Sequence, residues 1–376
     1  MNYSAGQILA AHIGDLHGGL RARRDQVRRS MAFLLEDLRR VRPDVIVQAG
    51  DIFDTRSSIE DRNDFADWLA EAADIAPFLA VRGNHDVPGD LAIFNRVAAA
   101  HLIRIWEQPA FHRGSGLLVL GLPHQEKGGL VTEGSITVSN RASEDRIRDH
   151  LAIEFRREAD AFDGPVMLVA HADVDGRSKS NGESRLHQGL ILSIDDLLAS
   201  GADYVALGHI HKLQKLHPRV AYAGSIARAS FGEDPDEKGY LLVTLGPKGA
   251  LPEIEIRPIP CRPMVTITST WTDDGWDTHG AEDLPEDAEI RVRLSAPEDH
   301  ATDLAAAQAE VLERFPDAQV EPEVVPVDRR RSEAIAVAET PEDMLRAYWE
   351  ASELPAPEFQ AKAIAALGLI QKEIAA

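Results

Sequence analysis

Residues 45–54 have the sequence VIVQAGDIFD, in which a strand-like apolar run ends at Gly50, Asp51 and Asp54. The carboxyl ends of parallel strands form the edge of a sheet where α/β proteins bind their ligands. Acidic residues placed directly after such a run are therefore expected to reach a shared crevice. The stretch predicts a parallel sheet with a charged site at one edge.

Four other short motifs follow apolar runs in the same way. They are Asp15-Leu16-His17, Gly83-Asn84-His85-Asp86, the isolated His171 and Gly208-His209-Ile210-His211. A lone histidine is more often a hydrogen-bonded core residue than a ligand, but here several histidines and carboxylates recur in the same context. Together the five motifs predict a two-metal phosphoesterase site.

The predicted ligands combine imidazole, carboxylate and amide donors. They are Asp15, His17, Asp51, Asn84, His171, His209 and His211. Residues two apart in an extended segment project from the same face, so each Asp-x-His or His-x-His pair can reach one site. Asp51 can bridge two ions because a carboxylate has two oxygens. This donor mixture suits Mn, Fe or Zn better than Mg or Ca, and two such ions about 3.5 to 4 Å apart can polarise a phosphoryl group.

His85 is expected to have a different role from its neighbour Asn84. It can stabilise charge on the phosphoryl oxygens or protonate the leaving oxygen, a contribution worth roughly 100-fold to 10,000-fold. The carboxylate of Asp54 is expected to hold the second ring nitrogen of His85 and so fix its tautomer. These two residues are the predicted catalytic pair.

Composition sets broad limits. The chain has 376 residues, a formal charge of -22 and one cysteine, Cys261, which excludes an internal disulfide framework. Two or three domains are expected at this length. The first residues lack a signal-peptide pattern and no apolar run is long enough to span a membrane, so a soluble cytoplasmic protein is expected. The charge favours a small substrate over nucleic acid, although two bound ions would make the site locally positive.

Strands and helices alternate over the first domain, residues 1–260. Apolar runs predict strands at 8–13, 45–49, 77–81, 166–170 and 203–207, and helical periods predict helices at 23–42 and 61–73. This rhythm predicts helices on both faces of a parallel sheet. Further strand patterns follow at 220–223, 240–245 and 253–259 without helices between them, so the sheet is expected to become antiparallel there.

Three prolines, at positions 258, 260 and 263, mark a domain boundary. Strand patterns at 265–270, 289–294 and 320–327 and a helical pattern at 301–314 predict a small α+β domain over residues 263–328. A polar linker is expected at 329–340. Thr340 begins a helix start signal, and residues 341–376 are expected to form two amphipathic helices that need a partner surface.

The motifs resemble those of the calcineurin-like metallophosphoesterase superfamily and, within it, of the Mre11/SbcD DNA-repair nucleases. The resemblance is carried by residues 45–55, 79–86, 203–214, 221–225 and 231–243. The segment Tyr222-Ala223-Gly224-Ser225, followed by Phe231-Gly232-Glu233 and Lys238-Gly239, is more specific to this branch than the ligands are. The resemblance implies an α/β core of two packed mixed sheets flanked by helices, a small α+β capping domain and a C-terminal helical pair.

The resemblance also implies roles for the site residues. One Mn2+ would be held by Asp15, His17, Asp51 and His211, and a second by Asp51, Asn84, His171 and His209, with Mg, Fe or Zn as alternatives. His85 would be the catalytic histidine. Some members have histidine where this chain has Asp54, which is the SbcD and phosphatase form.

The implied function is a DNA nuclease of double-strand-break repair, a 3'-5' exonuclease on double-stranded ends and an endonuclease on single-stranded DNA. Residues 263–328 would form the DNA-binding cap. Residues 341–376 would bind the coiled coil of a Rad50/SbcC-like ATPase. Similar nucleases form homodimers through helices near the second and third motifs, for which residues 61–73 and 91–105 are candidates.

Two other functions remain open. A small-substrate phosphodiesterase or phosphatase of the same superfamily would suit the acidic charge, and a non-catalytic scaffold could bind DNA ends or a partner. Around the site, His12 is expected to satisfy the surroundings of the first strand. Three further groups of residues lie near the motifs. His124, Asp173 and Asp175 could line the cleft, and Arg21, Arg23 and Arg24 could contact phosphates. Residues 177–187 could contact DNA or form a solvated loop, and the loop is favoured.

Overall fold

The computed structural model describes residues 6–20, 23–125, 140–178, 191–326, 338, 340–352 and 357–374. The chain divides into two compact units. The larger one comprises Met1–Thr266 and Glu282–Arg291, and the smaller one comprises Ile267–Ala281 and Val292–Ala376. Each unit combines strands and helices, and the predicted metal ligands all belong to the larger one.

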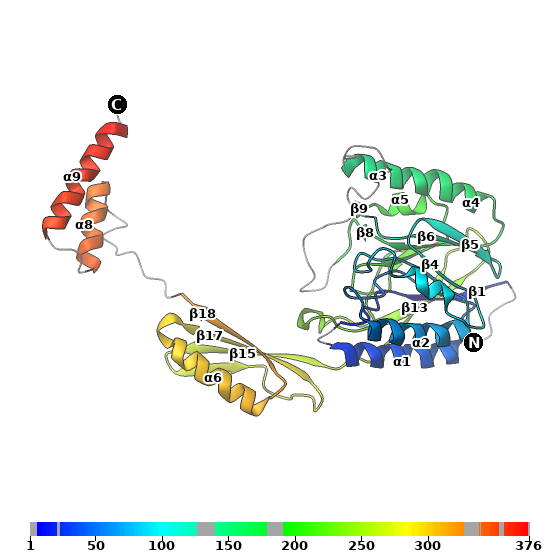
Figure 1. Cartoon of the computed structure of the whole chain (residues 1–376), viewed down its shortest axis with the longest axis horizontal. Helices are drawn as coiled ribbons and strands as arrows, with labels where there is room; N and C mark the ends of the chain where they lie inside the picture. Colours follow the sequence, from blue (N-terminus) through cyan, green and yellow to red (C-terminus); the bar gives the residue numbers. More distant parts are fainter. Residues whose placement is uncertain are drawn as a thin grey trace. The chain divides into compact units, whose positions relative to one another are not determined.

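Two six-stranded sheets form the larger unit (Figure 1). The first contains β1 (Ile8–Ile13), β2 (Val45–Gln48), β3 (Phe78–Val81), β4 (Ile103–Trp106), β13 (Gly239–Leu245) and β14 (Glu253–Pro258), in the order β14-β13-β1-β2-β3-β4. The second contains β5 (Ala110–Gly114), β6 (Leu117–Leu122), β7 (Val166–His171), β10 (Tyr204–Gly208), β11 (Gln214–His217) and β12 (Val220–Tyr222), in the order β11-β12-β10-β7-β6-β5. A short parallel pair, β8 (Asp173–Val174) and β9 (Ile191–Leu192), lies apart from both.

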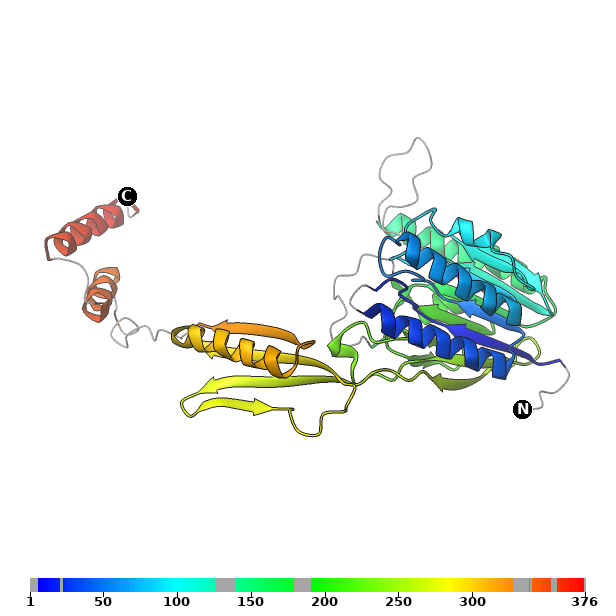
Figure 2. The same ribbon diagram turned by 60° about the horizontal axis from the view of Figure 1, so that its bottom comes forward.

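Helices cover the outer face of each sheet (Figures 1 and 2). The first sheet packs against α1 (Arg24–Val41), α2 (Ile59–Ile75) and the short η2 (Ala92–Arg96). The second packs against η3 (His150–Phe155), α4 (Arg156–Asp160) and α5 (Ile194–Leu198), and α3 (Asn140–Asp149) leads into η3. One further turn, η4 (Phe231–Glu233), precedes β13.

The side chains of β1 explain why the sheets stack. Leu9, Ala11 and Ile13 belong to the core formed with α1 and α2, whereas Ile8 and Ala10 belong to the core between the two sheets. Successive side chains of a strand point to opposite faces. Since both faces of β1 are mainly apolar, one face packs against helices and the other packs against the second sheet.

The expected α/β core of two packed mixed sheets is confirmed, but the arrangement inferred from the βαβ rhythm alone is wrong. Among the described residues, each sheet has helices on one face, and the other sheet covers its second face. A strand with two apolar faces does not reveal what covers each of them. The sheet does become antiparallel at β13 and β14, but β12 runs parallel to β10.

The segment 91–105, expected to supply a dimer helix, does not form one. It contains the short η2 and the beginning of β4. The strands β4, β5 and β6 were not predicted, although Leu117–Leu122 is apolar throughout and fully buried. The other candidate dimer segment, 61–73, does lie within a helix, α2.

The smaller unit is built on a four-stranded sheet. Its elements are β15 (Met264–Thr272), β16 (Gly275–His279), β17 (Glu289–Pro297), η5 (Glu298–His300), α6 (Ala301–Arg314) and β18 (Gln319–Val325), with strand order β16-β15-β17-β18. The strand β16 was not predicted. It pairs with β15 as a hairpin in which Trp271 faces Trp276 with ring centroids 5.4 Å apart, and such cross-strand aromatic pairs stabilise hairpins.

Two helices follow, α8 (Pro341–Ser352) and α9 (Pro357–Ile374). The expected helix start is confirmed, because the backbone N–H of Asp343 donates to Oγ1 of Thr340 at 3.1 Å. Met344, Tyr348 and Phe359 are largely exposed. Most of the predicted linker, 329–340, lies outside the described residues.

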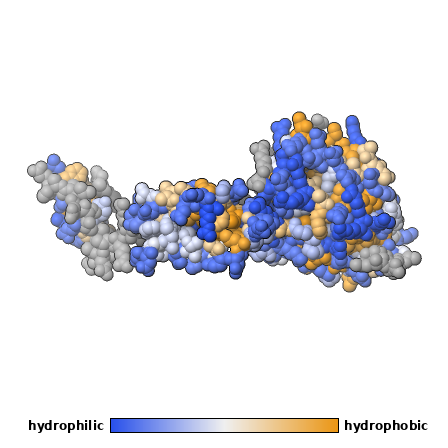
Figure 3. Space-filling model, turned by 90° about the horizontal axis from the view of Figure 1, so that it is seen from below, coloured by the Kyte–Doolittle hydropathy of each residue, from blue (hydrophilic) through white to orange (hydrophobic). Residues whose placement is uncertain are grey.

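No helix among the described residues has the length and apolar character needed to cross a bilayer. The face seen in Figure 3 is mainly hydrophilic, with apolar side chains scattered over it.

Candidate metal centre

All nine predicted site residues lie at the carboxyl ends of five strands. Asp15 and His17 follow β1, Asp51 and Asp54 follow β2, Asn84 and His85 follow β3, His171 ends β7, and His209 and His211 follow β10. The strands β1, β2 and β3 are neighbours in the first sheet, and β7 and β10 are neighbours in the second. Packing of the two sheets therefore brings the two sets of loops together.

The first group of ligand atoms lies around His17. Its Nε2 atom is 2.8 Å from Nε2 of His211. Asp15 is fully buried beside them, and its Oδ1 atom accepts a hydrogen bond of 2.9 Å from the backbone N–H of His209. Residues from opposite sheets thus meet at one point.

The second group lies around His171. Its Nε2 atom is 2.8 Å from Oδ1 of Asn84 and 3.4 Å from Oδ2 of Asp51. Nδ1 of His209 is also 2.8 Å from Oδ1 of Asn84. Ligand atoms of Asp51, His171 and His209 all lie within 4.8 Å of one another, which is close enough for a single ion to contact them.

Polar partners at Nδ1 orient three imidazole rings. Nδ1 of His171 is hydrogen-bonded to the carbonyl oxygen of Ala49 at 2.7 Å and Nδ1 of His211 to Oε1 of Glu233 at 3.1 Å, whereas Nδ1 of His17 lies within ion-pair distance of Oδ1 of Asp54, at 3.2 Å. A ring that donates through Nδ1 presents the lone pair of Nε2 on its other side. All three Nε2 atoms therefore point at the cluster.

Two features of these side chains fit bound cations. Among the described residues, Oδ2 of Asp15 is buried without any hydrogen-bond partner. The Nε2 atoms of His17 and His211 face each other at 2.8 Å, so either a proton or a bound cation must lie between the two nitrogens. The imidazole, carboxylate and amide donors match Mn, Fe or Zn better than Mg or Ca.

The ionisable groups of the cluster interact strongly. Burial raises the pKa of Asp15, and the nearby His171 offsets this only in part. Burial also acts to raise the pKa of Asp51, but the charge of His171 outweighs it and the pKa lies well below its usual value. Burial would lower the pKa of His171, yet the carboxylates of Asp51 and Asp15 raise it to about 9. The cluster attracts positive charge, as a cation site does.

The loops that carry the ligands are strained. His17, Asp51 and His209 have φ angles of 50°, 51° and 104°, a region that residues other than glycine seldom occupy. Each such conformation costs on the order of 1–3 kcal/mol and is found mainly at functional sites. Gly50 has φ of 97°, and a Cβ there would lie 2.3 Å from Nδ1 of His171.

Comparison with known proteins agrees with this geometry. Residues 8–213, more than half of the chain and all of the site, match the model of the family described as calcineurin-like phosphoesterase. The chain belongs to this family. The phosphoesterase is also 28% identical, over 286 residues, to the DNA double-strand break repair protein Mre11 of Aeropyrum pernix. That similarity covers 71% of this chain and 64% of the Mre11 protein.

Two solved structures are more distantly similar to the phosphoesterase. The protein TT1561 of Thermus thermophilus has 19% identity and a TM-score of 0.38, with 64% of this chain and 98% of that chain covered. A dimetal phosphatase from Danio rerio has 13% identity and a TM-score of 0.36, with 66% of this chain and 98% of that chain covered.

The catalytic pair expected in this phosphoesterase is arranged differently from the prediction. Nδ1 of His85 contacts the backbone carbonyl of Asp54 at 2.5 Å, whereas the Asp54 carboxylate lies against His17. The loop after β2 turns the backbone carbonyl of Asp54 towards His85, so the Asp54 carboxylate can reach His17 of the first motif. Asp54 therefore contacts both histidines, one through its carbonyl and one through its carboxylate.

Asp86 was part of a predicted motif but was given no role. Its buried carboxylate accepts backbone N–H groups of Ile52, Phe53 and Gly83 at 2.9 to 3.2 Å. Burial and the charge of Asp51 raise its pKa to about 6. Asp86 ties the loop after β2 to the loop after β3, and so holds two sets of ligands in register. Its position in the Gly-Asn-His-Asp motif was the available signal.

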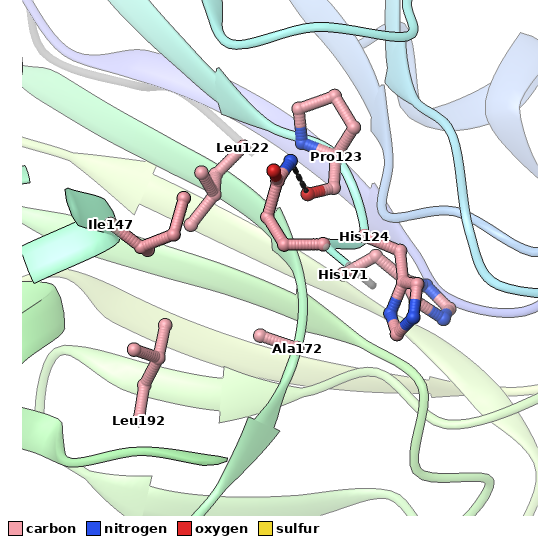
Figure 4. A pocket seen from close by; sticks show the side chains of 8 residues that line it. Leu122, Pro123, His124, Ile147, His171, Ala172 and Leu192 are labelled. Carbon is pink, nitrogen blue, oxygen red and sulfur yellow. Dashed lines mark hydrogen bonds between the residues drawn. The ribbon is translucent and has the colours of Figure 1, made fainter. Parts of the chain in front are cut away.

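His124 does line the site, as expected. Its ring centroid lies 5.9 Å from that of His171 and 6.1 Å from that of His209. Figure 4 shows it beside His171, at one end of a pocket lined mainly by apolar side chains such as Leu122 and Ile147. Burial lowers the pKa of His124 to about 3, so the ring is neutral at physiological pH.

Other expectations are met in part. His12 bridges the two sheets through Tyr204 and the carbonyl of Leu207, which is the expected structural role. Nη2 of Arg177 donates a hydrogen bond of 2.7 Å to Oδ2 of Asp173. Arg23 and Arg24 form ion pairs with acidic side chains. Arg21 and residues 179–190 lie outside the described residues.

Sequence reasoning missed Glu233 and Lys238 as site residues, although both lie in segments that carry the family resemblance. Glu233 contacts His211, and Lys238 contacts Glu233. A glutamate and a lysine five residues apart are ordinary surface residues in most sequences. Only the fold reveals that both are buried beside a predicted ligand.

Proposed function

We propose that this protein is a two-metal DNA nuclease that hydrolyses phosphodiester bonds at DNA ends and in single strands. The observation that carries the proposal is the convergence of seven potential ligands and His85 from loops of both sheets. The similarity to the DNA double-strand break repair protein Mre11, over 71% of the chain and therefore over more than the residues 8–213 that match the family model, supports DNA as the substrate class.

The donor atoms form two groups that would each hold one ion, Mn2+ being the expected one. Asp15, His17, Asp51 and His211 would hold the first, and Asp51, Asn84, His171 and His209 the second. When bound, such ions act as Lewis acids that polarise a phosphoryl group and stabilise charge on its oxygens. The carboxylate of Asp51 would be a ligand common to both sites.

The remaining steps belong to the protein's own side chains. His85 is exposed, its backbone N–H donates to Oδ1 of Asp51 at 2.9 Å, and its Nδ1 faces the carbonyl of Asp54. This leaves Nε2 of His85 directed away from Asp54, where it can give a proton to the leaving oxygen. Asp54 orients His17 through its carboxylate and His85 through its backbone.

The rest of the chain has roles in the same proposal. The small α+β unit, over residues 263–328, would cap the nuclease site and bind DNA. The helices α8 and α9, within residues 341–376, would bind the coiled coil of a Rad50/SbcC-like ATPase, since Met344, Tyr348 and Phe359 expose apolar surface there. Homodimerisation is proposed through α2.

One observation favours a second candidate, a phosphodiesterase or phosphatase for small substrates. Residues 267–326 contain sixteen Asp and Glu but only three Lys and Arg. Phosphate-backbone binding depends on clustered cationic side chains. A strongly acidic cap would repel DNA unless its contacts are made elsewhere.

A direct assay separates these candidates. The purified full-length protein would be incubated with Mn2+ and either an end-labelled linear duplex or bis(p-nitrophenyl) phosphate. Mn-dependent shortening of the duplex, lost on addition of EDTA, supports the nuclease. Hydrolysis of the small diester with an intact duplex favours the second candidate. Neither activity in a metal-loaded protein would indicate a non-catalytic scaffold that binds DNA ends or a partner.

A further inference from the structure

A buried ion pair lies behind one edge of the candidate metal centre. Nζ of Lys238 is 2.7 Å from Oε2 of Glu233, and both residues are 2% exposed. Lysine and glutamate are seldom buried to this extent. Removal of two charges from water costs free energy that the attraction between them often fails to recover. A pair of this kind therefore calls for an explanation beyond the stability of the fold.

The contacts of the pair converge on His211. Oε1 of Glu233 is 3.1 Å from Nδ1 of the imidazole ring, and Nζ of Lys238 donates to the backbone carbonyl of the same residue at 3.0 Å. Lys238 also donates to Oγ of Ser225 at 2.9 Å, and the backbone N–H of Ala229 donates to Oε2 of Glu233 at 3.2 Å. The pair thus holds both the ring and the backbone of His211.

The segment that supplies Glu233 is itself fixed in place. Phe231, two residues earlier, is buried, and the guanidinium groups of Arg23 and Arg291 lie 5.3 and 4.8 Å from its ring centroid. Cations over an aromatic face are attracted by the ring quadrupole. Glu233 therefore approaches His211 from a rigid turn rather than from a free loop.

A carboxylate behind a histidine has a defined chemical effect. It accepts the proton of Nδ1, so the ring presents the lone pair of Nε2 on the opposite side. In this protein that side faces Nε2 of His17, at 2.8 Å. His209, two residues earlier, instead presents Nδ1 to Asn84. The two histidines of the same motif thus use different ring nitrogens, and Glu233 accounts for the choice at His211.

We propose that Glu233, held by Lys238, is a positioning residue that orients His211 towards the ion on the Asp15 and His17 side. The inference rests on the proposed two-metal site but not on DNA as its substrate. It also predicts an asymmetry. The contacts of the pair lie at His211 and not at His171 or Asn84, so an ion on the His171 side would depend less on Glu233 than an ion on the His17 side.

The test measures Mn2+ binding to the full-length protein by isothermal titration calorimetry and by electron paramagnetic resonance. Glu233→Gln removes the charge at His211 but leaves Lys238 buried without its partner. The double variant Glu233→Gln with Lys238→Met removes both charges at similar volume and protects the measurement from misfolding. Glu237→Gln, an exposed glutamate in the same segment, is the matched control.

The wild type and the control are expected to bind two ions. In the folded double variant one ion is expected to keep its affinity and the other to bind about 10-fold to 100-fold more weakly, with loss of the signal from coupled Mn2+ ions. Two ions bound with wild-type affinity in that variant would refute the positioning role of Glu233 and leave the proposed two-metal site unaffected. A wild-type protein that binds no Mn2+ would overturn the proposed function and this inference together.

Discussion

Asp37 connects the helix α1 to the sheet that carries six of the nine site residues. Its buried carboxylate accepts hydrogen bonds from the hydroxyl of Tyr240 at 2.7 Å and from Nη2 of Arg257 at 2.8 Å. A hydrogen bond to a charged group contributes about 1.5 to 3 kcal/mol to stability. The Arg257 side chain is 31% exposed, so solvent screening reduces the contribution of its ion pair with Asp37 to stability. Asp37→Asn is therefore expected to lower the free energy of unfolding by about 2 kcal/mol at pH 7.

The stability difference between wild type and Asp37→Asn is expected to depend on pH in a defined direction. Burial acts to raise the pKa of Asp37, but the hydrogen bonds from Arg257 and Tyr240 outweigh it, so the pKa in the folded protein lies below the usual value. A depressed carboxyl pKa stabilises the fold above the unfolded-state value of about 4, and this stabilisation is lost as the pH falls through the folded value. The difference between wild type and Asp37→Asn should therefore shrink as the pH falls below about 4.

Urea unfolding followed by circular dichroism between pH 7 and pH 3 would measure both quantities. Glu36→Gln changes an exposed carboxylate on the same helix and should shift stability by less than about 0.5 kcal/mol. A difference for Asp37→Asn that is as small as this control at pH 7, or that stays constant down to pH 3, would refute the reasoning.

Two further substitutions test the site and the C-terminal helices. Gly50→Ala places a Cβ 2.3 Å from Nδ1 of His171 and should weaken Mn2+ binding at least about tenfold in calorimetry. Gly89→Ala has a similar φ of 88° but open space around the new atom, so equal losses in both variants would show that backbone strain, and not the contact with His171, is responsible. Tyr348→Glu alters a side chain that is 54% exposed on α8 and should prevent co-purification with the proposed coiled-coil ATPase partner while hydrolysis is unchanged. Unchanged complex formation, with Glu350→Gln as the control, would contradict the proposed docking role.

The positions of the site residues were predictable because each motif follows an apolar strand. The sheet edge then brings them together whatever the details of the loops. The order of strands was less predictable. Both faces of strands such as β1 and β6 are apolar, so the sequence pattern is the same for one sheet between two helical layers and for two stacked sheets. The choice depends on which surfaces are complementary in three dimensions.

The fine geometry of the site was not predictable for a related reason. Asp54 was correctly expected near His85, but which atom makes the contact depends on the backbone angles of a loop. Glu233 and Lys238 gain their role only when the turn before β13 packs under His211. Contacts between residues more than twenty positions apart leave no periodic trace in a single sequence.

Bound metal and His85 are proposed to act as separate parts of one hydrolytic site. The most direct test loads the wild type and His85→Asn with Mn2+ and measures, on the same samples, the number of bound ions and the rate of cleavage of an end-labelled linear duplex. Both proteins are expected to bind two ions, and the variant is expected to cleave at least about 100-fold more slowly. Loss of an ion in the variant would make His85 a ligand, and undiminished cleavage with two ions bound would contradict its catalytic role.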